Sequence, residues 1–266
     1  MTGAGAVLAL ILLEWAAGWI VVAAWSQSWD VIRRGHFRIT AYAVAFLAVL
    51  TSLAYRSIHY VDPSAAAIHV QNILVWSFLG ATVCYVLVQF SNTDVPGVVI
   101  GYLAGGLGAA ALVASATLLR DWFVPLAAVG LITGAALLGA VTNGMMLGHW
   151  YLNQPGLKTW ALARLTTLGI VTVGASAVAG VAGAHTLTNA PTHGATLGLS
   201  GFGDSFGPAF FVVWAVLILF TGGVVWAAWR CVNIKSIQSA TGLYYVAILT
   251  AGVAEFLVRY LMLNAS

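Results

Sequence analysis

Charged residues are scarce in this chain of 266 residues. Asp, Glu, Lys and Arg make up only 6% of the sequence, whereas a soluble domain carries roughly 25%. Hydrophobic residues make up 61%. A water-soluble fold cannot bury this much apolar surface, so the sequence predicts that the protein is embedded in a lipid bilayer.

Cysteine and proline are also rare. The two cysteines, Cys84 and Cys231, lie too far apart in sequence for a CxxC metal or redox motif and are too few for a disulfide framework. We expect Cys84 inside a membrane span and Cys231 in a connection. The six prolines fall in predicted connections or at predicted helix starts. Helices broken by proline, which some transporters use, are therefore not indicated.

Long apolar runs recur along the whole chain, and eight of them can cross the hydrocarbon core as helices. The runs are continuous rather than alternating, which favours helices over a barrel. The first run is too long and too polar at its centre for a typical signal peptide, so we expect it to be retained. The predicted fold is an all-α polytopic transmembrane bundle with short loops, a single integral-membrane domain over 1–266. Its spans are 4–25, 39–56, 68–90, 97–119, 125–147, 161–183, 208–229 and 241–262.

Basic residues near the predicted helix ends set the expected orientation. Seven of them lie in the odd-numbered connections and three in the even-numbered connections or near a terminus, so both termini are predicted on the non-cytoplasmic side. Six tryptophans are expected at the same inner interface as the seven basic residues. The absence of a transit peptide and the high Gly, Ala, Val and Trp content favour a bacterial inner (plasma) membrane. The seven are Arg33, Arg34, Arg38, Lys158, Arg164, Arg230 and Lys235, and the six are Trp25, Trp29, Trp150, Trp160, Trp226 and Trp229.

Small residues repeat at i, i+4 spacing in the fourth, fifth and sixth predicted spans. Small residues let helix backbones approach closely in lipid, so this pattern predicts tight helix packing. The alternative is a cofactor that lies against the glycines. The longest connection, 184–207, is rich in glycine and is expected to fold over the mouth of the bundle.

Four ionisable residues lie inside predicted spans, where such groups are costly and usually face the bundle interior. At about 1.5 Å of rise per residue, Glu14 is predicted near the midplane, and Glu255 and Arg259 in the outer half of the bilayer. His69 opens the third span on the same side. Glu255 and Arg259 are spaced i, i+4 with the acid first. They form either a structural ion pair or a carboxylate held for proton transfer, with Arg259 reaching the outer interface.

Glu14 has no ionic partner within its own predicted helix. Burial without a partner favours the protonated form of a carboxyl group. Glu14 is therefore predicted either to exchange protons or to donate a hydrogen bond to a neighbouring helix. We expect the first, third and eighth spans to meet around it.

The third predicted span carries a candidate cofactor site. His69, Asn72 and Trp76 share one helical face, which suits a quinone headgroup because the ring needs hydrogen-bond donors and a flat wall. The same His69 is a candidate axial ligand for haem b, with Arg259 near the propionates. His149 is the alternative ligand at the inner interface.

Metal binding would need a convergent set of side chains. His59, His69 and His185 are candidates on the outer side, together with Glu255. No pair has a diagnostic spacing, so the sequence predicts no defined metal site.

The leading functional hypothesis is an integral-membrane redox or electron-transfer subunit that interacts with a quinone or haem b. Glu14 and Glu255 would exchange protons, and the chain would be a non-catalytic part of an oxidoreductase assembly. The alternative is a proton-coupled transporter or channel for a small solute or metal ion, and the third hypothesis is a cofactor-free assembly or scaffold subunit. The expected partners are the lipid bilayer and other membrane or peripheral subunits, and no nucleic acid.

Overall fold

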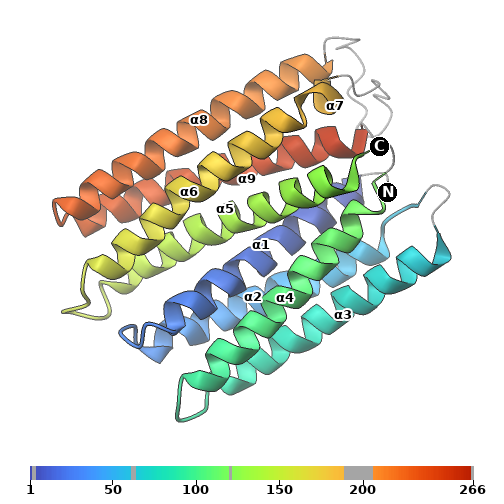
Figure 1. Ribbon diagram of the computed structural model, residues 1–266. Coiled ribbons are helices and arrows are strands. Elements are labelled where there is room, and N and C mark those ends of the chain that lie inside the picture. Colours follow the sequence, from blue (N-terminus) through green and yellow to red (C-terminus); the bar gives the residue numbers. More distant parts are fainter. Residues whose placement is uncertain (2–3, 61–63, 120–121, 189–205, 265–266) are drawn as a thin grey trace.

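The computed structural model describes residues 1, 4–60, 64–119, 122–188 and 206–264 (Figure 1). Within these ranges all regular structure is helical. Eight of the described helices are long and apolar enough to cross a membrane, which confirms the predicted all-α transmembrane bundle. They are α1 (Ala4–Gln27), α2 (Arg34–Arg56), α3 (Ala65–Val88), α4 (Val95–Ala116), α5 (Val124–Trp150), α6 (Trp160–Ala182), α8 (Phe206–Asn233) and α9 (Ile237–Asn264).

Several helices continue beyond the apolar runs that predicted them. Helix α2 begins at Arg34 rather than at residue 39, and α8 ends at Asn233 rather than at residue 229. Polar residues at the headgroup level can remain helical, and hydropathy does not mark them. Cys231 consequently lies in the last turn of α8, so its predicted place in a connection is wrong. A short helix, α7 (Ala184–Thr188), begins the long predicted connection, whose residues 189–205 lie outside the described residues.

The membrane helices form two groups of four (Figure 1). In the first group α1, α2, α3 and α4 pack in sequence and α4 returns to α1. In the second, α5, α6, α8 and α9 close in the same way, and α1 packs on α5 to join the groups. Both termini lie at one end of the bundle, which we call the terminal end; the opposite end is the far end (Figure 1). The terminal end corresponds to the side that the sequence predicts to be non-cytoplasmic.

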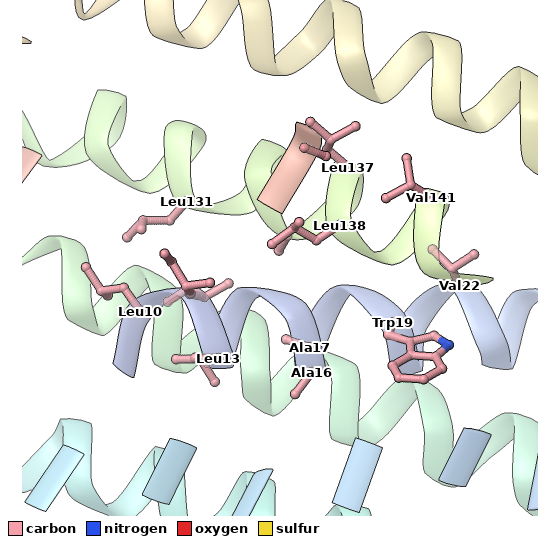
Figure 2. Packing of buried hydrophobic residues seen from close by; sticks show 14 of the residues in the cluster. Leu10, Leu13, Ala16, Ala17, Trp19, Val22, Leu131, Leu137, Leu138 and Val141 are labelled. Carbon is pink, nitrogen blue, oxygen red and sulfur yellow. The ribbon is translucent and has the colours of Figure 1, made fainter. Parts of the chain in front are cut away.

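Helix α1 forms the centre of the molecule. In its most apolar stretch 78% of the residues are buried, compared with 28% in the peripheral α3. Figure 2 shows leucines of α5, including Leu138, next to small residues of α1 such as Ala17. A Cβ atom on Gly18 would lie 1.7 Å from the carbonyl oxygen of Ala135. The two backbones therefore pack directly against each other, as the small-residue pattern of α5 predicted.

Aromatic and basic side chains cluster at the far end of the bundle. The ring centroids of Trp25 and Trp29 are 4.8 Å apart, and those of Trp29 and Trp160 are 5.5 Å apart. The Arg164 guanidinium lies over both Trp160 and Trp29, at 4.4 and 5.6 Å. This arrangement matches the interfacial belt of tryptophan and basic residues that the sequence predicts there.

Candidate functional site

Three charged side chains meet in the interior of the bundle, and we call them the triad: Glu14 on α1, and Glu255 and Arg259 on α9. Arg259 Nε donates to Glu14 Oε1 at 2.6 Å, and its Nη2 donates to Glu255 Oε2 at 2.8 Å. Both glutamate side chains are fully buried, and that of Arg259 is 2% exposed. The bundle thus brings together residues 245 positions apart around one guanidinium.

Helices α5 and α6 complete the surroundings of the triad. The Gly130 carbonyl of α5 accepts a second bond from Arg259 Nη2 at 2.8 Å, and the Ser176 hydroxyl of α6 donates to Glu255 Oε1 at 2.8 Å. The site also depends on Gly134 of α5. A Cβ atom there would lie 2.4 Å from Arg259 Nη2 and 2.6 Å from Glu255 Oε2. Only a glycine lets the α5 backbone approach these charges so closely.

Charge balance makes the triad a place to hold a proton. Two ionised carboxylates and one guanidinium would leave one net negative charge buried in the bilayer, which is unfavourable. One bound proton makes the triad neutral. The two oxygens of Glu255 each accept a hydrogen bond, from Ser176 and from Arg259. Glu14 Oε2 is buried and has no hydrogen-bond partner among the described residues, so it is the oxygen best placed to carry the proton.

A small cavity lies against the triad from the terminal end. It is lined by Glu255, Arg259 and Ser176 and extends past Trp122 and Leu187 near the ends of the helices. Its volume is about 20 Å³, room for about one water molecule. The cavity has room for about one water molecule beside Glu255 and Arg259 and is too small for a larger solute.

A second polar group lies on the other side of Glu14. The hydroxyls of Tyr55 and Ser115 are hydrogen-bonded at 2.8 Å, and the Gln71 amide donates to Ser115 at 2.9 Å. All three side chains are buried, and the Tyr55 hydroxyl lies within electrostatic range of Glu14. Helices α2, α3 and α4 thus supply neutral polar groups on the side of α1 away from Arg259.

The far half of the bundle interior holds neutral polar groups instead of charges. Asn143 Nδ2 of α5 donates to Ser26 Oγ of α1 at 3.2 Å, and the Asn143 side chain lies next to the His36 ring of α2. Both nitrogens of His36 and the Thr40 hydroxyl are buried without a hydrogen-bond partner among the described residues. We call His36, Thr40, Asn143 and Ser26 the far cluster.

Two sequence-based expectations about the triad need correction. Arg259 does not reach the outer interface; it turns inward and pairs with Glu14 as well as with Glu255. Glu14 and Glu255 share one site, as hypothesised, but α3 does not help to form it, because α3 packs between α2 and α4. Helices α5 and α6 take that place. Sequence reasoning missed Ser176 and Gly134, since their helices offered many similar small residues.

The predicted cofactor residues lie away from the triad. His69, Asn72 and Trp76 are exposed on the outer face of α3, and Trp76 lies under the Arg56 guanidinium at 5.9 Å. His149, the alternative haem ligand, is exposed at the far end of α5. The structure therefore separates this set from the triad, with which the sequence grouped it.

The metal-ligand candidates do not converge either. His59, His69 and His185 are all exposed, whereas Glu255 is buried. No three His, Cys, Asp or Glu side chains in the described part of the chain form a group suited to a metal ion.

The chain matches no protein-family model, no curated protein and no solved structure.

Proposed function

We propose that this membrane protein binds and transfers protons at the triad of Glu14, Glu255 and Arg259. The observation that carries the proposal is one guanidinium shared by two fully buried carboxylates. A structural ion pair needs one acid for one base. The second acid requires a proton for neutrality, and that proton can leave only if a charge or another proton compensates for it.

The cavity supports a proton rather than a solute as the transferred species. Its volume of about 20 Å³ admits about one water molecule. A water molecule there can hydrogen-bond to Glu255 on the terminal side of the triad. Glu14 and Glu255 then hold one proton between them, while the shared Arg259 stays protonated.

The far cluster provides polar groups for the other half of the path. Asn143, Ser26, Thr40 and His36 lie in the far half of the bundle interior, and several of their polar atoms lack partners among the described residues. Such atoms are available to hydrogen-bond with water. We propose that this cluster connects Glu14 to the far end through water that enters the far half of the bundle interior.

Proton flux through proteoliposomes tests the proposal. Vesicles of phosphatidylethanolamine and phosphatidylglycerol containing a pH-sensitive dye are given a pH gradient, with valinomycin and potassium to compensate charge. The wild-type protein is expected to collapse the gradient faster than empty vesicles do, and Glu14→Gln is expected to abolish the difference. Arg56→Gln, at an exposed arginine outside the triad, is the control and should retain the flux. Equal rates for wild type and Glu14→Gln would contradict the proposal.

A second candidate function is the redox role, with a quinone or haem b bound beside the chain. It is favoured by the exposed set of His69, Asn72 and Trp76 on α3, where Arg56 covers the indole ring. Polar side chains at a lipid-facing position suit a contact with another membrane subunit or with a quinone headgroup. The triad would then supply protons to that partner. A visible absorbance spectrum tests for haem, and solvent extraction of the purified protein tests for quinone.

For localisation, we propose the bacterial inner membrane with both termini outside. The basic residues and tryptophans of the far end support this orientation. Cysteine-accessibility labelling at the far end, for example at Ser28, tests which side it faces.

A further inference from the structure

A long groove follows one side of α1 and α4 and changes from apolar to polar along its length. Its apolar part is a cavity of about 430 Å³ between α1, α4 and α5. Its polar part is a cavity of about 540 Å³ at the far end, between the end of α1 and the start of α4. Neither part includes a residue of the triad, so the groove is independent of the proposed proton path.

The two cavities follow one another on the same helical faces. Trp25 of α1 lines the apolar cavity, and Ser28, three residues further and just beyond the end of α1, lines the polar one. On α4, Tyr102 lines the apolar cavity and Val98, one turn earlier, lines the polar one. Residues three or four apart on a helix are neighbours on its surface. The two cavities therefore lie next to each other along α1 and α4, from the helix ends toward the bilayer core.

The apolar part is hollow because several of the side chains that line it are small. Alanines and glycines from three helices line it, and the polar atoms of its side chains are limited to the Trp25 indole and the Tyr102 hydroxyl. The alanines include Ala109 of α4 and Ala136 of α5. An unfilled space would lose dispersion contacts along all of these walls. In a bilayer, the group available to fill it is a hydrocarbon chain.

The polar part carries charges of both signs. The Arg34 guanidinium pairs with Asp94 at 2.9 Å, and each side chain is about one-quarter exposed. Asp30 lies in the same cavity, is exposed, and forms no ion pair among the residues that the structure describes. The Arg34 guanidinium, which also donates to the Ser91 carbonyl, suits a phosphate through its remaining N–H groups, and the additional carboxylate of Asp30 suits an ammonium group.

We propose that this groove binds one zwitterionic phospholipid with an amine headgroup, such as phosphatidylethanolamine. The headgroup lies among Asp30, Arg34 and Asp94, and one acyl chain lies in the cavity between α1, α4 and α5. This orientation of the lipid matches that of the bilayer lipids, because the polar cavity lies at the headgroup level marked by the tryptophan cluster of the far end. The lipid fills the space between the two groups of four helices beside the junction of α1 and α5.

Native mass spectrometry tests the proposal on the full chain. The protein is purified with an equal mixture of phosphatidylethanolamine, phosphatidylglycerol and a long-chain quinone, and the adducts that survive detergent removal are identified. One phosphatidylethanolamine per chain is expected. A quinone adduct, equal retention of the two phospholipids, or no retained adduct would overturn the proposal.

Two variants test separately the site for the acyl chain of the lipid and the site for its headgroup. Ala109→Leu fills the apolar cavity and should remove the adduct, whereas Ala110→Leu, the same change at the neighbouring exposed position, should retain it. Asp30→Asn should lower the preference for phosphatidylethanolamine over phosphatidylglycerol about three- to fivefold, the scale of one partly exposed charge pair. Because Asp30 is exposed, this variant is informative even if Ala109→Leu fails to fold. Loss of the adduct in both alanine variants, or an unchanged preference in Asp30→Asn, would contradict the assignment.

Discussion

The two halves of the bundle interior hold polar groups of different charge. In the terminal half, the charges of the triad are surrounded by donors and acceptors from α5 and α6. In the far half, the far cluster is neutral and leaves several buried polar atoms without partners among the described residues. The difference follows from the free energy of burial, because an unpaired charge in lipid is far more unfavourable than an unpaired neutral donor or acceptor. Substitutions in the two halves should therefore have very different effects.

The largest effect is expected for Arg259→Met. Removing the guanidinium leaves two adjacent buried carboxyl groups without their cation, and breaking a buried ion pair costs about 3–5 kcal/mol. Thermal unfolding in detergent should show a greatly lowered midpoint. Replacing all three triad residues by neutral ones (Glu14→Gln, Glu255→Gln and Arg259→Met) should recover much of the loss. A single variant as stable as the wild type would mean that the triad is not a coupled unit.

Gly134→Ala should have the second largest effect. The added Cβ would lie 2.4 Å from Arg259 Nη2, so the paired Arg259 and Glu255 side chains or α5 must shift, at a cost of about 1–3 kcal/mol. Gly130→Ala is the matched control one turn away on the same helix, because its Cβ would lie at an ordinary 3.6 Å from Arg259 Nη1. Its stability should stay within about 1 kcal/mol of the wild type. Equal unfolding midpoints for the two variants would contradict the close packing of α5 on the triad.

Glu14→Gln should alter proton transfer much more than stability. If Glu14 carries the proton, glutamine replaces one neutral side chain by another of nearly the same shape, and the cost should stay below about 1.5 kcal/mol. The proteoliposome flux should nevertheless disappear. Unfolding midpoints and flux measured on the same preparation separate the two effects. A large loss of stability would show that Glu14 is ionised in the folded protein.

The smallest effect on stability is expected for His36→Phe in the far cluster. The His36 ring packs against Phe37 and Trp150, with centroids 5.0 and 5.8 Å away. Neither ring nitrogen has a partner at full hydrogen-bond distance among the described residues, so an aromatic replacement loses at most a weak contact with the Asn143 side chain. The free energy of unfolding should change by less than about 1.5 kcal/mol. Proton flux should fall, because the cluster loses a group that can carry a proton; an unchanged flux would exclude His36 from the path.

The sequence predicted the membrane spans and the ionisable residues of the triad, because hydropathy and the rarity of charge are properties of single positions. It did not predict how each helix is oriented about its own axis, and therefore which of its faces is buried. On α3, His69, Asn72 and Trp76 formed the predicted face, but the buried face carries Gln71 and Tyr85 instead. Both faces combine polar and aromatic residues, so hydropathy did not distinguish them.

The sequence did not identify the residues that surround the triad, for a related reason. Ser176 and Gly134 lie in helices rich in small residues, and only the position of α9 selects them. The i, i+4 spacing of Glu255 and Arg259 correctly predicted their pairing. The bond from Arg259 to Glu14 depends on a contact between the first and last helices, which no local pattern records.

The central claim is that the triad holds one proton, and isotope-edited infrared spectroscopy tests it most directly. Glu14 and Glu255 are the only two glutamates in the chain, so labelling glutamate side-chain carbons with ¹³C shifts the bands of these two groups alone. At neutral pH we expect one labelled protonated carboxyl group in the wild type, none in Glu14→Gln, and two in Arg259→Gln. A wild-type spectrum with two ionised labelled carboxylates and no protonated band would contradict the account.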